Sequence, residues 1–206
     1  MASEPVQQSG RLTRADLMSL EQYSTARKDF RARVLDHKRS RLVPIGPNTT
    51  WAFEDRLTIQ YQVQEMLRIE RIFEAAGIQD ELDAYNPLIP DGSNWKVTFL
   101  IEFPDPDERK LRLAALKGIE DRCWVQIAGC ERVFAIADED LERENEEKTS
   151  SVHFLRFELS PEMVRQAHAG AAISVGIDHN NYKHEVAPLN PAQRDSLTHD
   201  LKPQTH

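Results

Sequence analysis

The chain has 206 residues, of which 40% are hydrophobic and 29% are charged, and its formal net charge is −8. This length suits one domain with short tails, and no apolar run approaches the roughly 18 residues that a membrane span needs. Composition thus excludes a membrane protein, a disulfide-rich secreted scaffold and a disordered chain. The two cysteines do not have zinc-knuckle spacing and the N-terminus lacks a secretory signal, so we expect a cytoplasmic protein.

The basic residues are concentrated near the N-terminus. Residues 1–50 hold nine Lys and Arg against five Asp and Glu, whereas the rest of the chain is acidic. Such a segment either packs on the acidic body and faces solvent, or serves as an arm for an acidic partner or a nucleic acid. Asp29 and Asp36 interrupt the basic residues and few aromatic residues accompany them, which favours the first interpretation.

The first third of the chain is predicted to be helical after a short tail. Residues 1–10 are rich in Ser and Gln and are expected to be a disordered tail. A variant capping box from Thr13 to Asp16 begins a short helix, and a second helix follows over residues 26–39. Proline, glycine and asparagine within residues 42–53 predict a hairpin at the edge of a sheet.

The longest predicted helix runs over residues 55–76 and ends at Gly77. Helical spacing places Glu70 in the middle of the apolar arc of this helix. A carboxylate in such surroundings must be neutral, ion-paired or bound to a metal. Arg56 projects close enough to be its partner, so Glu70 belongs either to a structural ion pair or to a site that uses it as a metal ligand or proton carrier.

Beyond this helix the pattern changes to strands in hairpins. Residues 95–103 are rich in β-forming residues and read as a central strand. Ser160 and Pro161 have the types that begin a helix. The other predicted strands cover residues 123–128, 132–137, 151–159, 171–177 and 183–187, and the other predicted helices cover residues 78–85 and 105–117.

This order of elements predicts an α+β fold in which N-terminal helices and a long central helix pack on a mostly antiparallel sheet. We expect a single domain over residues 11–187 and a C-terminal tail over residues 188–206.

The loop over residues 86–94 is a candidate binding site. Its apolar residues would be costly to expose, and Asn86, Asp91 and Asn94 offer polar groups. The alternative is a loop that tucks its apolar pair into the core and turns at Asp91.

Three of the seven histidines are candidate metal ligands. His179 and His184 flank one turn, and His153 lies on a predicted strand. Each histidine has an alternative interpretation without a metal, and for His153 this alternative is a histidine packed in the core. A ferritin-like di-iron site needs a Glu-x-x-His pair, which the chain does not contain. No cofactor is evident from motifs, and a bound metal ion is the alternative.

Common catalytic motifs are missing, because the sequence contains neither a Gly-rich nucleotide-binding loop nor a nucleophile elbow or zincin motif. The acidic run over residues 138–148 is either a solvated surface or a docking face for a basic partner. The residues leave open whether the protein is an enzyme.

Several long stretches resemble an uncharacterised bacterial domain family of about this length. They are Leu12–Leu20, Phe53–Gln62, Glu65–Arg71, Glu81–Asn94 and Val152–Phe157. The resemblance covers nearly all of residues 11–187 and implies no defined activity or catalytic residues. It implies a genomic setting, because members are often encoded beside rubrerythrin-like di-iron proteins and iron–sulfur oxidoreductases.

From this we expect a cytoplasmic accessory protein of a redox or peroxide-defence system, with a rubrerythrin-like or iron–sulfur protein as its partner. One alternative is a metal-dependent enzyme or a metal-binding regulator that uses Glu70 and the histidines. A second is a nucleic-acid-binding regulator that uses the basic residues 27–41, although we consider this partner class the weaker one.

Overall fold

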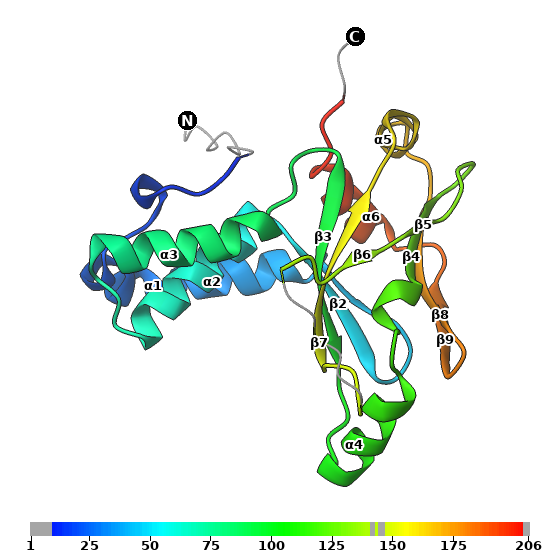
Figure 1. The fold of residues 1–206 in the computed structure, drawn as a ribbon. Coiled ribbons are helices and arrows are strands. Elements are labelled where there is room, and N and C mark those ends of the chain that lie inside the picture. The colour runs from blue at the N-terminus through cyan, green and yellow to red at the C-terminus, as the bar shows by residue number, and fades with distance from the viewer. Residues whose placement is uncertain (1–9, 141–142, 144–146, 204–206) are drawn as a thin grey trace.

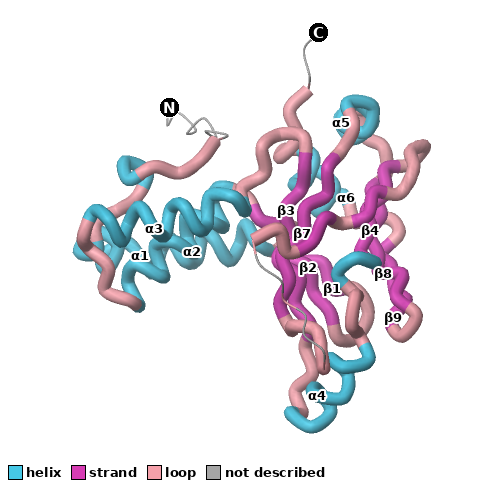
Figure 2. Tube along the Cα trace, in the orientation of Figure 1, coloured by secondary structure: helices cyan, strands magenta, loops and turns pink. Residues whose placement is uncertain are grey.

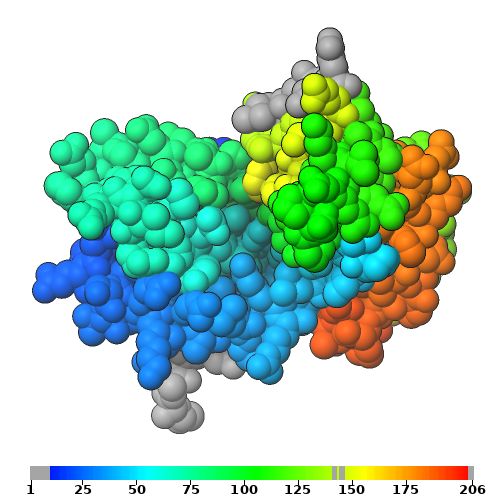
Figure 3. All heavy atoms as spheres, turned by 90° about the horizontal axis from the view of Figure 1, so that it is seen from below, coloured from blue at the N-terminus to red at the C-terminus, as the bar shows by residue number. Residues whose placement is uncertain are grey.

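Two antiparallel sheets and six α-helices make up the part of the chain that the computed structural model describes, namely residues 10–140, 143 and 147–203. The predicted α+β class is therefore confirmed. Helices α1, α2 and α3 lie together at one side of the sheets in Figure 1, and the tube in Figure 2 separates this helical part from the strands. From below, the blue-to-teal helical residues and the orange β8–β9 hairpin occupy opposite sides (Figure 3).

The first sheet has five strands in the order β1-β2-β3-β7-β6. Alternate residues of its strands are buried, as a sheet with one face on the core requires. The predicted strand at residues 95–103 is central, because β3 pairs with β2 on one side and β7 on the other. Its strands are β1 (Leu42–Pro44), β2 (Thr49–Glu54), β3 (Asn94–Ile101), β6 (Ile136–Ala137) and β7 (Val152–Glu158).

The second sheet has four strands in the order β5-β4-β8-β9, all paired antiparallel. Its strands are β4 (Cys123–Ile127), β5 (Val133–Phe134), β8 (Ile173–His179) and β9 (Tyr182–Val186). The segment at 132–137, expected as one strand, is divided: β5 joins this sheet, and β6 joins the first.

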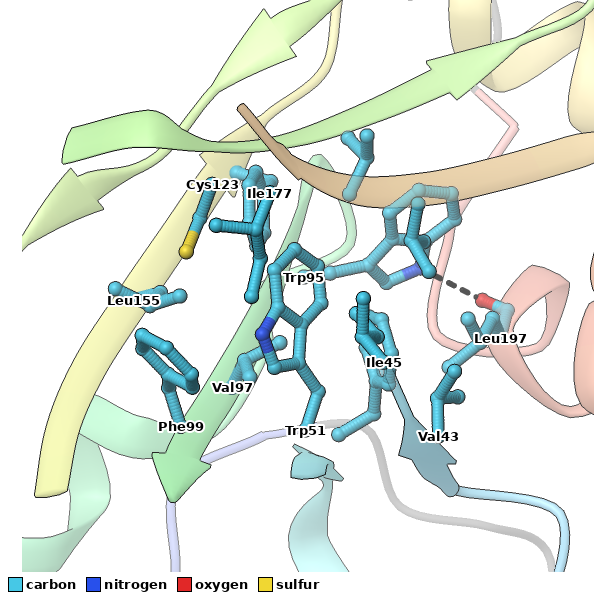
Figure 4. Close-up of a cluster of buried hydrophobic side chains, with 14 of the residues drawn as sticks. Val43, Ile45, Trp51, Trp95, Val97, Phe99, Cys123, Leu155, Ile177 and Leu197 are labelled. Carbon is cyan, nitrogen blue, oxygen red and sulfur yellow. Dashed lines mark hydrogen bonds between the residues drawn. The ribbon is translucent and has the colours of Figure 1, made fainter. Parts of the chain in front are cut away.

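Side chains from both sheets form one large hydrophobic core. Trp51 of β2 stacks on Phe157 of β7 with ring centroids 5.3 Å apart. Trp95 of β3 is also fully buried, and its indole N–H donates to the Leu197 carbonyl at 2.9 Å, as Figure 4 shows. Burial of large aromatic residues makes this core the main source of stability.

The N-terminal helices build smaller cores of their own. Helix α1 (Leu20–Lys38) is one continuous helix, begun by a capping box at Ser19, where we expected two helices. Ser24 and Thr25 do not interrupt it, because Thr25 satisfies its hydroxyl by donating to the Glu21 carbonyl.

The predicted central helix is wrong in its length. Helix α2 (Arg56–Ile69) ends at Ile69, and helix α3 (Ala75–Tyr85) begins after five intervening residues and contains Gly77. The left-handed conformation that we expected at Gly77 is adopted instead by Arg71, with φ of 54°. The chain therefore turns between the two helices, and the apolar arc drawn across them does not exist.

The remaining helices are α4 (Pro106–Ala115), α5 (Pro161–His168) and α6 (Pro191–Thr198). Ser160 caps α5 and Pro161 is its first residue, as predicted. Residues 189–201, which we expected in a C-terminal tail, instead add Leu189, Leu197 and Leu201 to the main core. Among the described residues, no helix has the length and apolar character needed to cross a membrane.

Candidate metal centre

His153 is the most deeply buried of the predicted site residues. It lies on β7 opposite Phe99 of β3, and its side chain is 0% exposed. Strand periodicity explains this position, since alternate residues of β7 face the core. The ring lies near the start of β7, where polar groups from three other segments reach it.

Both ring nitrogens of His153 have polar neighbours. Nδ1 lies 2.6 Å from Oδ2 of Asp138. Nε2 lies 3.0 Å from Oγ1 of Thr149, 3.2 Å from the Ser150 carbonyl oxygen and 3.9 Å from Oε2 of Glu120. A buried imidazole with this many oxygen neighbours is held in one orientation.

Asp138 is positioned by its own backbone. It follows β6 and adopts a positive φ of 48°, a conformation that Asp tolerates better than most residues. Its N–H donates to the Phe154 carbonyl at 2.8 Å, and its Oδ1 accepts from the Phe154 N–H at 2.9 Å. Arg143 Nε lies 3.2 Å from Oδ1. The carboxylate is thus fixed, with Oδ2 directed at His153.

Glu120 and Thr149 complete the cluster from the other side. Glu120 begins the 3-10 helix Glu120–Arg122, directly before β4, and it is buried. The Thr149 hydroxyl lies 3.4 Å from Oε2 of Glu120, and the Thr149 N–H donates to the Leu113 carbonyl at 3.2 Å. These contacts connect the end of β7 with the start of the second sheet.

The arrangement has the composition of a metal site. One donor atom each from Glu120, Asp138 and His153 lies within 4.8 Å of the others. Metal-ligating histidines commonly have a carboxylate at the other ring nitrogen, and here Asp138 lies against Nδ1 while Nε2 faces Thr149, Ser150 and Glu120. Nitrogen and oxygen donors without a thiolate suit Mn²⁺, Fe²⁺ or Zn²⁺.

Glu70 is not part of this centre. It is the C-cap residue of α2 and is exposed, so our expectation of a carboxylate within an apolar arc is wrong. The expected pairing with Arg56 does not form either, because Arg56 NH2 donates to Oδ1 of Asp16 at 2.5 Å. The exposure of Glu70 follows from the turn after Ile69. The pairing fails for another reason, because 14 residues of helix separate Arg56 from Glu70 by about 21 Å along the axis.

The structure does not bring His179 and His184 to His153. His179 Nε2 lies 3.0 Å from the Lys117 carbonyl oxygen, and its Nδ1 accepts from the Asn181 N–H at 3.2 Å. Both of its nitrogens therefore have backbone partners. His184 is exposed on β9, and its ring packs at 4.6 Å from the Tyr182 ring.

The polar residues of loop 86–94 have structural partners. Asn86 is buried and exchanges two hydrogen bonds with the Leu12 backbone, at 2.7 and 2.9 Å. Asp91 accepts from the Ser93 N–H and hydroxyl, which closes a turn. Asn94 donates to Glu158 at 3.2 Å. Asn86 and Asp91 nevertheless lie on the wall of a cavity.

The acidic run has a structural use over its first residues. Asp138 contacts His153, Glu139 pairs with Arg156 at 2.8 Å, and Asp140 pairs with Arg143 at 2.5 Å. Residues 141–142 and 144–146 of the run lie outside the described residues. The docking face predicted for 138–148 is therefore described only in part.

Sequence reasoning missed a second buried polar cluster around Arg41. This guanidinium is 2% exposed, and it donates to Asp200 at 2.6 Å and to the carbonyls of Phe53 and Glu54. Its Nε also lies 3.5 Å from Asp55, a carboxylate that contacts His37 at 2.5 Å and accepts from the Thr58 N–H at 2.9 Å. Nothing local marks Arg41 as buried, since it lies in a basic stretch that suggests a surface.

Known proteins that match this chain share its architecture, and their descriptions name no activity. No curated protein matches the chain. A crystal structure of a novel protein of unknown function from Burkholderia pseudomallei is 50% identical and has a TM-score of 0.88, covering 93% of this chain and 99% of that chain. The profile of the family described as protein of unknown function (DUF3501) matches residues 11–201, a range that includes α6. The resemblance to an uncharacterised domain family is thus confirmed, and the chain belongs to the DUF3501 family.

Proposed function

We propose that the protein binds one divalent transition-metal ion beside His153, with His153 Nε2 and Glu120 as ligands and with Asp138 holding the ring from Nδ1. The observation that supports this function is the buried cluster of His153, Glu120 and Asp138, in which a carboxylate already lies against one ring nitrogen. The function is that of a metal-binding protein, one of the two roles within our metal-dependent alternative, with Glu120 and Asp138 taking the place that we gave to Glu70.

The spacing of the oxygen atoms around Nε2 supports this proposal. Ligands about 2.1 Å from a tetrahedral ion lie about 3.4 Å from one another. The Nε2 distances to Thr149, Ser150 and Glu120 are 3.0, 3.2 and 3.9 Å. Small movements of the Thr149 and Glu120 side chains and of the Ser150 carbonyl would therefore enclose an ion between one nitrogen and three oxygens.

Burial favours a closed site over an open catalytic one. The His153, Asp138 and Glu120 side chains are only 0%, 9% and 10% exposed. Structural metal sites are typically completed by protein ligands, whereas catalytic sites keep a position for water or substrate. The bound ion would therefore connect β7, β6 and the start of β4, which suits a structural or regulatory role.

Equilibrium dialysis against Mn²⁺, Fe²⁺ and Zn²⁺, followed by elemental analysis, tests the proposal. We expect about one ion per chain for at least one metal, and a loss of affinity of about 10–100-fold for Asp138→Asn. Glu120→Gln should bind weakly as well, because it replaces a ligand with an amide. His184→Gln is the control, since His184 is exposed and lies on β9, an edge strand of the second sheet.

Two results would overturn the proposal. The first is wild-type protein that retains none of the three metals after dialysis. The second is metal binding that Glu120→Gln and Asp138→Asn leave unchanged while both variants remain folded by circular dichroism. In either case the Thr149 hydroxyl would simply donate to His153 Nε2 in a hydrogen-bonded cluster without an ion.

We also propose the setting in which this protein acts: a cytoplasmic accessory role in a redox or peroxide-defence system, beside a rubrerythrin-like or iron–sulfur oxidoreductase protein. Two exposed apolar side chains at the turn between α2 and α3 support a docking role, with Ile69 57% and Phe73 74% exposed. The free cysteines Cys123 and Cys130 suit a reducing compartment.

Affinity purification of the tagged protein from its own host, read by mass spectrometry, tests this setting. We expect wild type to recover a di-iron or iron–sulfur protein in near-stoichiometric yield, and Phe73→Glu to lose it. Leu111→Glu is the matched control, because Leu111 is 73% exposed on α4, away from the turn. Recovery of neither partner class, or equal recovery by Phe73→Glu, would contradict the proposal.

A further inference from the structure

A cavity of about 380 Å³ lies where the two ends of the described chain meet loop 86–91. Three of its lining residues are cations, namely Arg11, Lys96 and Lys202. Its other walls are formed by Gly10, Asn86, Pro87, Ile89, Pro90 and Asp91. The volume falls within the range of small-molecule sites, and the wall combines proline and isoleucine with positive charge.

Arg11 and Lys202 are placed at this cavity by specific contacts. Asn86 holds Leu12 through two hydrogen bonds to its backbone, which fixes the neighbouring Arg11 at the wall. The Lys202 N–H donates to the Gly92 carbonyl at 2.9 Å. The Lys202 stem lies against Gly92, which has φ of 111° and where a Cβ would come within 2.9 Å of Lys202 Cγ and Cδ.

Lys96 reaches the cavity from β3, where the charges of Glu139, Asp91 and Glu158 compensate its own charge in part. It lies directly opposite Arg156 of β7, a like-charge pair that destabilises a sheet. Arg156 takes up the nearby carboxylates, at 2.8 Å from Glu139 and 2.7 Å from Glu158. Burial, and then the Arg156 charge, lowers the pKa of Lys96.

None of the three cations forms an ion pair or a side-chain hydrogen bond with another described residue. This distinguishes them from Arg41, Arg56 and Arg156, which are all bound to carboxylates. The one carboxylate of the wall, Asp91, is turned to Ser93 by two hydrogen bonds. An anion in the cavity would therefore meet three cations against the single carboxylate of Asp91, which already interacts with Lys96.

From this placement we propose that the cavity is a binding site for a small organic anion, with a carboxylate or phosphate group held by Arg11, Lys96 and Lys202 and an apolar portion against Pro87 and Ile89. Charge-assisted hydrogen bonds provide the affinity for the oxyanion, and the prolines provide a rigid apolar wall. The site shares no residue with the His153 centre, so anion binding can be tested independently of metal binding.

Isothermal titration calorimetry and NMR titration with phenyl phosphate and with benzoate test this site, with phenol as the neutral probe and inorganic phosphate as the probe without an apolar part. We expect at least one of the two aryl anions to bind more tightly than phenol and than phosphate. Added salt should weaken that binding, because the contacts are charged.

Three variants locate the binding. Lys96→Gln, Lys202→Gln and Arg11→Gln should each weaken the aryl anion by about fivefold or more. Lys110→Gln, on exposed α4, is the matched control for a change of net charge and should leave the affinity unchanged. The proposal is overturned if neither aryl anion binds at millimolar concentration, or if Lys110→Gln weakens binding as much as Lys96→Gln does.

Discussion

Asp55 and Asp200 contact the same buried guanidinium of Arg41, and yet the pKa of Asp55 is lowered and the pKa of Asp200 is raised. Burial raises the pKa of Asp200 to about 6, and the Asp55 charge adds to this, against the attraction of Arg41. Burial acts on Asp55 too, but the hydrogen bond from His37 and the charge of Arg41 outweigh it and hold the pKa of Asp55 at about 2. Arg41 lies closer to Asp200 than to Asp55, so the difference comes from the further hydrogen bonds that Asp55 accepts from His37 and the Thr58 N–H and that Asp200 lacks.

The raised pKa of Asp200 gives stability a defined dependence on pH. Asp has an ordinary pKa of 3.8, so Asp200 contributes its full stabilisation below that pH and loses it as the pH rises through about 6. We expect Asp200→Asn to remove this decline, because an amide does not ionise. Urea denaturation between pH 4 and pH 7 would then show a flatter profile of unfolding free energy than that of wild type.

The control for this prediction is Asp195→Asn, because Asp195 is an exposed carboxylate on α6 beside the same cluster. Its profile should follow that of wild type. A profile of Asp200→Asn that runs parallel to wild type would show that Asp200 does not titrate in this range.

At the scale of single elements, Gly176 of β8 sets how closely the second sheet can pair. It lies opposite Trp124 of β4, and a Cβ at this position would lie 2.7 Å from Cε2 of the indole ring. The ring cannot retreat easily, because it is buried and the Arg132 guanidinium lies 3.8 Å from its centre. The close approach of strand and ring requires a residue without a side chain.

We therefore expect Gly176→Ala to lower the free energy of unfolding by about 1–3 kcal/mol, the usual cost of an added methyl group in a packed core. Urea denaturation measures this loss. Ser174→Ala on the same strand is the control, since it adds no atoms and should change stability by less than about 1 kcal/mol. Equal stability of Gly176→Ala and wild type would mean that Trp124 is free to move.

The elements with local signals could be predicted from the sequence. Residues 95–103 alternate as a strand should, and Ser160 with Pro161 begins α5 where the cap rules place it. The break after Ile69 has no such signal, because apolar spacing continues past it and the left-handed residue is Arg71 rather than glycine or asparagine. The division of residues 132–137 between two sheets depends on partners far along the chain.

The candidate sites also divide into residues with a local signal in the sequence and residues that only the fold brings together. His153 could be singled out because it shares one face of its strand with the core residues Leu155 and Phe157. Its partners Glu120 and Asp138 could not, since they lie 33 and 15 residues away in the chain and are brought together by the pairing of β6 with β7. Loop 86–94 was a candidate from its composition, but the cations Arg11 and Lys202 belong to segments that were expected at the edges of the domain.

At the scale of the whole molecule, α6 completes the fold. Leu197 is fully buried in the core that both sheets share, and its carbonyl accepts from Trp95 of the central strand. Arg41 and Asp200 fix the end of the same segment to β2. The C-terminal segment therefore contributes to the cooperative core rather than adding to its outside.

Truncation of Leu197 tests this role. We expect Leu197→Ala to cost about 2–5 kcal/mol of unfolding free energy, as for leucines in other closed cores. Leu111→Ala, at an exposed leucine, should cost less than about 1 kcal/mol. Thermal and urea denaturation report both values, and a Leu197→Ala loss as small as that of Leu111→Ala would place α6 outside the cooperative unit.

The meeting of Gly10 and Lys202 at one cavity has a consequence for the order of the chain. A short linker would join these two positions without crossing the molecule, so the fold admits circular permutation. New ends can be opened at the exposed turn around Gly129, between β4 and β5. The permuted protein would keep every described strand pairing. The linker between Gly10 and Lys202 would then form a continuous segment beside the cavity.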